Sequence, residues 1–222
     1  MSHFIKQVEE NYLKALFKLK NREIKKVNNI ALANYMELNP ATVLEMMRKL
    51  ADKNLVQVLP DKSIQLTETG ERKAILIIRK HRLWEVFLVD KLKYKWNEVH
   101  DLAEQLEHIE SDDLVNRLEE FLKFPAFDPH GDPIPDKNGK IKLNATIPLN
   151  LGKKGKTYTV KSFAETEDAF LDYLTNINIQ PGTKITVLDL YEYDGSSSVQ
   201  INNNKLHISE KVAQNILVQL KK

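Results

Sequence analysis

The amino-acid sequence predicts a mainly helical N-terminal part followed by a small C-terminal β-barrel. Three observations support this fold class. Apolar residues recur at helical intervals from residue 4 to residue 122. Residues 124–148 then hold five of the eight prolines and two of the seven glycines, which is typical of a domain linker. Beyond them, apolar and polar residues alternate in short segments, as they do in β-strands.

The first elements form a predicted helix-turn-helix. Residues 4–20 have the spacing of an amphipathic helix, and residues 27–38 that of a short second helix. The break before Pro40 indicates a tight turn, in which Asn39 caps a third helix and Pro40 stands in or before its first turn. This third helix carries an apolar stripe made of Val43, Met46, Met47 and Leu50. In a helix-turn-helix the second helix enters the major groove of DNA.

A β-hairpin follows at once. Residues 55–60 and 64–70 alternate apolar and polar positions around a turn of Asp61, Lys62 and Ser63. A helix-turn-helix followed by a hairpin is a winged helix, which favours DNA binding over the alternative of a generic αα-hairpin. The distribution of charge along the chain gives some support to DNA binding. Residues 1–80 hold 15 basic and 9 acidic residues, a net of +6, whereas residues 81–222 hold 18 and 22, a net of −4.

Three more helices are expected before the linker. Thr67 begins a capped helix with Glu68 and Glu71 in its first turn, and this helix is long and apolar enough to be central. Residues 98–109 predict a second helix, and Ser111 with the acidic pair after it caps a third that continues to residue 122. Because readers of paired DNA half-sites are by default symmetric dimers, we expect residues 98–122 to supply a dimer surface.

The C-terminal residues predict a barrel of about 75 residues. One helix is expected at residues 166–175, and Pro181 with Gly182 marks a turn. The alternating segments that predict strands are TYTVKSF, TKITVLDLY, SVQINN and KLHIS. This part shows no chemistry of its own.

Two clusters of metal-type ligands lie on the central helices. Members of each cluster are spaced three or four residues apart, so their side chains share one helical face and can converge. Imidazole and carboxylate are common ligands of first-row divalent metals, and a site needs three or four of them. With no cysteine in the chain, any metal site uses nitrogen and oxygen donors. The alternative is a solvated charged face. The six residues are His81, Glu85, His100, Glu104, Glu107 and His108.

Composition excludes several classes of protein. Hydrophobic residues make up 42% and charged residues 29%, which is ordinary for a soluble globular protein. No apolar run approaches the ~20 residues that span a bilayer, and the N-terminus has no signal core. We therefore expect a cytoplasmic protein without membrane contact.

Four motifs together resemble a known family. RKHRLWE, EVHDLAEQLEHIES, TVLEMMRKL and DPHGDPIP are similar to segments of the metal-dependent repressors of the diphtheria toxin repressor and manganese transport regulator family. The resemblance covers nearly the whole chain. It implies a winged helix-turn-helix DNA-binding domain at residues 1–66, a helical metal-binding and dimerisation domain at 67–123, a proline-rich linker at 124–148, and an SH3-like, FeoA-like domain at 149–222.

The resemblance also implies two metal positions. His81, Glu85 and His100 match the ligands of one position. Glu104, Glu107 and His108 match those of the other, which the first helix completes near Asn11. Iron-sensing members have Cys where this chain has Glu104, and manganese-sensing members have Glu there. An oxygen donor favours a harder ion, so we expect Mn²⁺ first and Fe²⁺ second, with Zn²⁺ or other divalent metals able to bind in vitro.

Two residues of the first helix depart from the family pattern, and three later residues extend it. Asn11 stands where Met or Asp is usual, so this ligand would be a neutral amide. Lys14 replaces a second Glu of some manganese sensors, which disfavours a closely bridged two-metal cluster. Asp128 and His130 stand where related sensors supply further ligands, and Glu165 is a weaker candidate.

For DNA, the resemblance places the start of the recognition helix near base edges and basic residues near phosphates. The base-reading candidates are Asn39, Pro40, Ala41 and Thr42; the phosphate candidates are Arg48, Lys49 and Lys62. The sequence is therefore interpreted as a metal-dependent transcriptional regulator, a Mn²⁺-responsive repressor of metal uptake genes that acts as a homodimer on double-stranded operator DNA and is not an enzyme. The alternatives are an iron-responsive repressor, a winged-helix regulator that senses no metal, and a di-metal hydrolase.

Overall fold

The computed structural model describes residues 2–21, 26–142 and 145–220. The chain forms two compact units. The first comprises Met1–His81, Glu104–Asp113 and Pro135–Lys140. The second comprises Arg82–Ala103, Leu114–Ile134 and Ile141–Lys222.

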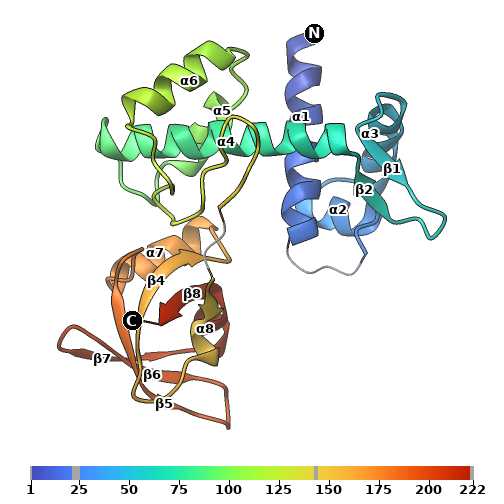
Figure 1. Cartoon of the computed structure of the whole chain (residues 1–222). Helices are drawn as coiled ribbons and strands as arrows, with labels where there is room; N and C mark the ends of the chain where they lie inside the picture. The colour runs from blue at the N-terminus through green and yellow to red at the C-terminus, as the bar shows by residue number, and fades with distance from the viewer. Residues whose placement is uncertain (1, 22–25, 143–144, 221–222) are drawn as a thin grey trace. The chain divides into compact units, whose positions relative to one another are not determined.

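The first unit contains the expected winged helix. Helices α1 (Ser2–Asn21), α2 (Asn29–Met36) and α3 (Pro40–Asp52) precede the antiparallel hairpin of β1 (Val56–Val58) and β2 (Ile64–Leu66) (Figure 1). Local signals set the boundaries. The Asn28 side chain accepts a hydrogen bond from the Ala31 N–H at 2.9 Å, and the Asn39 side chain accepts one from the Ala41 N–H at 2.8 Å. Helices α2 and α3 pack against one another, and the apolar side chains of Leu32, Val43, Met47 and Leu50 are buried.

The three central helices are present as expected, but the second of them ends earlier than the sequence predicts. Helix α4 (Glu68–Asp90) begins in the first unit and continues into the second; α5 (His100–Leu106) and α6 (Asp112–Phe121) follow. The expected helix over residues 98–109 stops at Leu106, so Glu107 and His108 lie in the turn beyond it. Both side chains bind partners on other elements, and these tertiary contacts prevail over helical periodicity.

The proline-rich segment is folded in the part that the structure describes. Its Ile134 belongs to the same buried cluster as Leu83 and Val86 of α4 and Val115 and Leu118 of α6. The four-domain division expected from the sequence stays a prediction.

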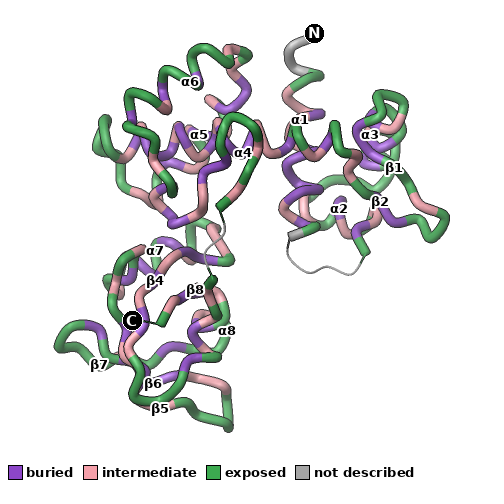
Figure 2. Tube along the Cα trace, viewed as in Figure 1, coloured by how far each residue is buried: buried purple, intermediate pink, exposed green. Residues whose placement is uncertain are grey.

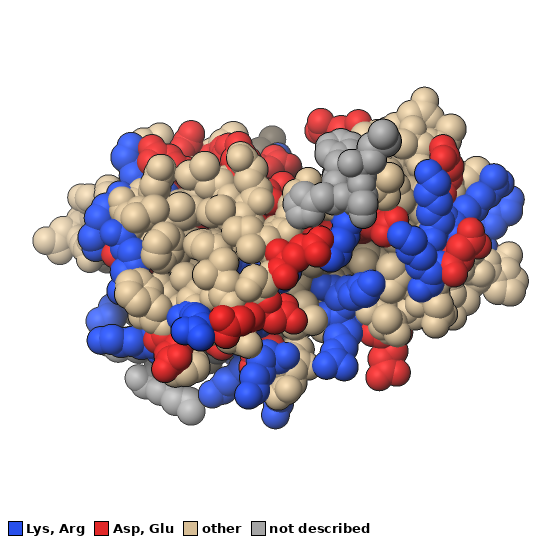
Figure 3. All heavy atoms as spheres, turned by 90° about the horizontal axis from the view of Figure 1, so that it is seen from above, with Lys and Arg blue, Asp and Glu red and all other residues tan. Residues whose placement is uncertain are grey.

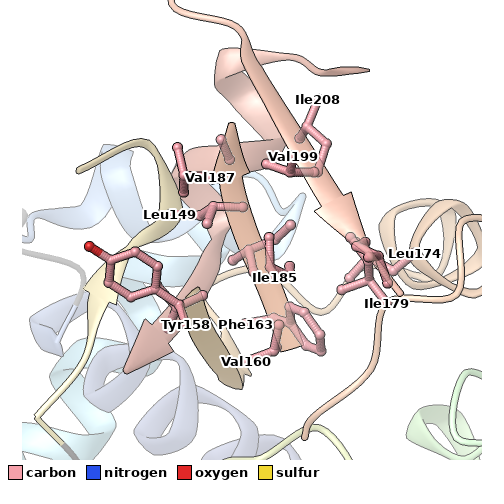
Figure 4. Close-up of a cluster of buried hydrophobic side chains, with 14 residues drawn as sticks. Leu149, Tyr158, Val160, Phe163, Leu174, Ile179, Ile185, Val187, Val199 and Ile208 are labelled. Atoms are coloured by element: carbon pink, nitrogen blue, oxygen red, sulfur yellow. The ribbon is translucent and has the colours of Figure 1, made fainter. Parts of the chain in front are cut away.

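The C-terminal part is the expected small β-structure. One antiparallel sheet has the strand order β3-β8-β4-β5-β6-β7. Its members are β3 (Ile147–Pro148), β4 (Thr157–Phe163), β5 (Lys184–Leu190), β6 (Ser197–Ile201), β7 (Asn204–Ile208) and β8 (Ile216–Leu220). Half-buried and buried positions alternate along most of β4 (Figure 2), and the buried side chains of the sheet form one apolar core (Figure 4).

Helix α7 (Asp168–Asn176) matches the predicted helix, whereas α8 (Glu210–Asn215), the 3₁₀ turn Leu149–Leu151 and strands β3 and β8 were not predicted. Across the described ranges, no helix has the length and apolar character needed to cross a membrane.

Candidate metal centre and DNA-facing surface

Glu85 is the centre of a buried group of metal-type donors. It is 2% exposed and lies one helical turn after His81 on α4. Its Oε1 lies 3.5 Å from Nδ1 of His100 and 3.5 Å from Nδ1 of His130. Within the described residues, His81, Glu85 and His100 form one group whose donor atoms lie within 4.8 Å of one another, and Glu85, Asp128 and His130 form another. We call the five residues the Glu85 cluster.

A tight turn at residues 128–133 brings Asp128 and His130 to Glu85. Asp128 Oδ1 accepts the backbone N–H groups of His130 at 2.8 Å and Asp132 at 3.0 Å. Gly131 has φ +86°, and a Cβ there would lie 1.7 Å from the Lys161 carbonyl oxygen. Glycine is therefore required at this position.

Arg82 binds the turn at residues 128–133. Its guanidinium donates to the Pro133 carbonyl oxygen at 2.6 Å and to Asp132 Oδ2 at 3.0 Å, and its Nε lies 3.4 Å from Asp128 Oδ2. These contacts hold the turn, and with it Asp128, against α4. The sequence prediction missed Arg82, although it lies within the RKHRLWE motif.

Hydrogen bonding assigns the tautomer of His130. Its Nε2 lies 2.8 Å from the Trp96 carbonyl oxygen, which can only accept, so Nε2 carries a hydrogen. The other ring nitrogen, Nδ1, faces Glu85. Once Nδ1 has lost its proton, an outer carbonyl partner and an inner nitrogen donor form the usual arrangement for histidine ligands of metals.

Electrostatics of the Glu85 cluster suit a divalent cation. Burial, and then the nearby Asp132 and Glu85 carboxylates, raise the pKa of Asp128 well above its ordinary value. Burial works against the charge of His130, but its hydrogen bond with Glu85 and the attraction of Glu85 and Asp128 raise the pKa of His130 to about 9. Protons thus neutralise a buried, acid-rich set of nitrogen and oxygen donors. Such a set fits a divalent metal, which displaces protons when it binds.

The second expected metal position is arranged differently. Lys14 Nζ, carried by α1, lies 2.9 Å from Glu104 Oε1 and 2.6 Å from Glu107 Oε1. His108 turns away to Glu10, with 2.6 Å between Nδ1 and Oε2, and its Nε2 lies 3.8 Å from Glu107 Oε1. Glu104, Glu107 and His108 are accordingly not among the donor groups found in the described residues.

Glu107 links the Glu85 cluster to α1. Its fully buried carboxylate pairs with Nδ1 of His81 at 2.6 Å as well as with Lys14. Burial works to raise the pKa of Glu107, but the hydrogen bond from His81 and the charge of Lys14 hold it below its ordinary value. Burial likewise opposes the charge of Lys14, yet Glu107 and Glu104 hold the pKa of Lys14 above its ordinary value.

Two weaker ligand candidates lie outside both groups. Asn11 is half-buried on α1, directly after Glu10. Glu165 is half-buried between β4 and α7, where its Oε1 accepts the Thr166 N–H at 3.1 Å. Sequence reasoning missed Glu10, whose partner His108 lies 98 positions away.

The DNA-binding candidates are all exposed. Asn39, Pro40, Ala41 and Thr42 form the N-terminus of α3, and Arg48 follows on the same helix. Lys49 pairs with Glu45 at 2.8 Å, and Lys62 stands at the hairpin turn with φ +63°. Figure 3 shows Lys and Arg side chains gathered over the winged-helix part, with a few acidic side chains among them.

Three family models match the chain in succession. Residues 5–64 match "Iron dependent repressor, N-terminal DNA binding domain", residues 67–136 match "Iron dependent repressor, metal binding and dimerisation domain", and residues 147–220 match "FeoA domain". The chain therefore carries a DNA-binding domain and a metal-binding and dimerisation domain. These matches confirm the resemblance expected from the sequence motifs.

Similar proteins cover nearly the whole chain. The diphtheria toxin repressor of Corynebacterium diphtheriae is 27% identical over 220 residues, which cover 95% of this chain and 96% of the relative. A solved manganese-dependent transcriptional repressor in complex with manganese is 35% identical, with a TM-score of 0.88 and coverage of 96% of this chain and 100% of that chain. The structure of ScaR with bound Cd²⁺ is 32% identical, with a TM-score of 0.82 and coverage of 95% and 98%.

Proposed function

We propose, on the premise that this chain belongs to the iron-dependent repressor family of metal-dependent transcriptional repressors, that Mn²⁺ is the ion it responds to and that metal uptake genes are its targets. The chain would act as a homodimer on double-stranded operator DNA, because symmetric dimers match paired half-sites. Residues 1–66 would read DNA, residues 67–123 would bind metal and dimerise, and residues 149–222 would form the appended domain.

The Glu85 cluster is the observation that carries this proposal. It combines two carboxylates, Glu85 and Asp128, with imidazoles from α4, α5 and the linker turn, and it contains no sulfur donor. Carboxylate donors and the lack of sulfur favour a harder ion, so Mn²⁺ is the first candidate and Fe²⁺ the second. When bound, the ion would supply the positive charge that the buried carboxylates of the metal-free chain obtain from protons.

Contacts around the Glu85 cluster connect it to α1, which belongs to the DNA-binding part. Nδ1 of His81 is bound to Glu107, and Nε2 would be the ligand atom. Glu107 in turn holds Lys14 of α1, so the orientation of His81 and the position of α1 depend on one another. An ordered Glu85 cluster would therefore restrict α1 and favour one placement of the winged helix.

We propose that the exposed start of α3 reads bases and that the basic side chains near it bind phosphates. Asn39, Pro40, Ala41 and Thr42 would face the major groove, as the N-terminal residues of a recognition helix do. The side chains of Arg48, Lys49 and Lys62 would contact the phosphate backbone of the DNA and position the winged helix on it.

A DNA-binding titration tests the proposal. Fluorescence anisotropy of labelled DNA from upstream of metal transporter genes is measured with Mn²⁺, Fe²⁺, Zn²⁺ or chelator. We expect tight binding with Mn²⁺ and weak binding in chelator. Glu85→Gln and Glu107→Ala should lose the response, whereas the matched control Glu98→Gln, at an exposed position just before α5, should keep it. A stronger response to Fe²⁺ would make the chain an iron sensor, and metal-independent binding would refute the switch.

A further inference from the structure

We infer that Lys14 is a built-in cation that takes the place of a second metal ion between Glu104 and Glu107, so that the chain responds to metal through the Glu85 cluster alone. The inference rests on the proposed function, because it concerns how many ions the switch uses. It goes beyond the sequence observation that Lys14 replaces an acidic residue, because the structure shows where its ammonium group lies.

The ammonium group occupies the space between the two carboxylates. Lys14 Nζ lies 2.9 Å from Glu104 Oε1 and 2.6 Å from Glu107 Oε1, and 7% of the Lys14 side chain is exposed. The Glu107 carboxylate is fully buried, and its other oxygen is taken by His81. The Glu104 side chain is 42% exposed, but removing the Glu107 carboxylate from water is costly unless a positive charge pairs with it. Lys14 supplies that charge from within the chain.

A metal ion at this place would have to expel the ammonium group. The ion would lose to a tethered competitor whose effective concentration does not depend on the metal in solution. The neighbouring ligands do not compensate for this. Asn11 offers a neutral amide, and Nδ1 of His108 is paired with Glu10 at 2.6 Å. The position is therefore closed to metal unless Lys14 is changed.

Lys14 also performs the structural task of a bridging ion. It connects α1 with α5 through Glu104 and with the following turn through Glu107. Because Glu107 also pairs with His81, a continuous set of charged contacts runs from α1 to the Glu85 cluster. One ion at the Glu85 cluster would then be sufficient to affect the position of α1.

Counting bound ions tests the inference. Full-length protein is titrated with MnCl₂, and free Mn²⁺ is measured by electron paramagnetic resonance, because the sharp signal of the hydrated ion is lost on binding. We expect about one ion per chain in the wild type, about two in Lys14→Glu, which exchanges the cation for a ligand, and about one in Lys14→Arg. The matched control is Lys53→Glu, which breaks the pair between Lys53 and Glu9 of α1 at 2.6 Å and should bind one ion.

Each outcome decides one claim. Two ions of comparable affinity in the wild type, or one ion in a folded Lys14→Glu variant, would overturn the inference. Binding of no ion by the wild type would instead refute the proposed function. Circular dichroism in Mn²⁺ shows whether Lys14→Glu folds. If it does not, Lys14→Gln decides: this variant should bind a second ion, and binding of a single ion would overturn the inference.

Discussion

Replacing Glu107 by Gln should destabilise the metal-free protein strongly. The Glu107 carboxylate is fully buried and pairs with His81 Nδ1 and Lys14 Nζ, each at 2.6 Å. Gln keeps the shape but removes the charge, which leaves the buried ammonium of Lys14 with Glu104 as its remaining carboxylate partner. Breaking a buried pair from one side costs about 3–5 kcal/mol. Because Glu104 still compensates part of the charge, we expect a loss near the lower end, about 3 kcal/mol.

Urea unfolding in chelator, followed by circular dichroism, measures this loss. Glu45→Gln is the matched control, because Glu45 forms an exposed pair with Lys49 at 2.8 Å within α3. Exposed pairs contribute little, so the unfolding midpoint of this variant should stay where it is in the wild type. Equal midpoints for Glu107→Gln and Glu45→Gln would refute the reasoning that Glu107 holds α1 through buried charge.

Three further predictions concern the Glu85 cluster and its turn. Because the pKa of His130 is raised from 6.5 to about 9, its proton stabilises the metal-free protein fully below pH 6.5, and this contribution is lost as the pH rises through about 9. Because Mn²⁺ must displace that proton, the affinity for Mn²⁺ should rise by up to about tenfold per pH unit between pH 6.5 and 8. Titrations with Mn²⁺ at several pH values measure this, and an affinity independent of pH would contradict it. Arg82→Ala should weaken Mn²⁺ binding at least about tenfold because the turn loses its fastening, with partial recovery in Arg82→Lys; unchanged affinity in Arg82→Ala would exclude this role. Gly131→Ala should lower the thermal midpoint far more than Gly155→Ala, since both glycines have positive φ but Gly155 has open space around it; equal losses would show that the turn tolerates a side chain.

Local signals in the sequence predicted the winged helix well. Asn39 and Pro40 define the start of α3 through capping chemistry that involves adjacent residues. The spacing of His81 and Glu85 likewise places both on one face of α4. Elements were missed at the C-terminus, although Ser209 is an N-cap that marks the start of α8. A helix of one and a half turns next to a strand gives too short a pattern to recognise.

The candidate site could be predicted less completely, because its geometry depends on long-range contacts. The spacing of Glu104, Glu107 and His108 indicated one helical face, but α5 ends at Leu106 and His108 pairs with Glu10 of α1. The position of Lys14 could not be derived from spacing either, because its two carboxylate partners lie 90 and 93 positions away.

Coupling between metal and DNA is the central claim, and the affinity for Mn²⁺ with and without operator DNA tests it most directly. Linkage requires that DNA raise the affinity for Mn²⁺ by the same factor by which Mn²⁺ raises the affinity for DNA. We predict equal factors, each well above one, from calorimetric titrations of the whole chain at one salt concentration. The same Mn²⁺ affinity in the presence and absence of DNA would contradict the account, because the Glu85 cluster would then have no influence on the winged helix.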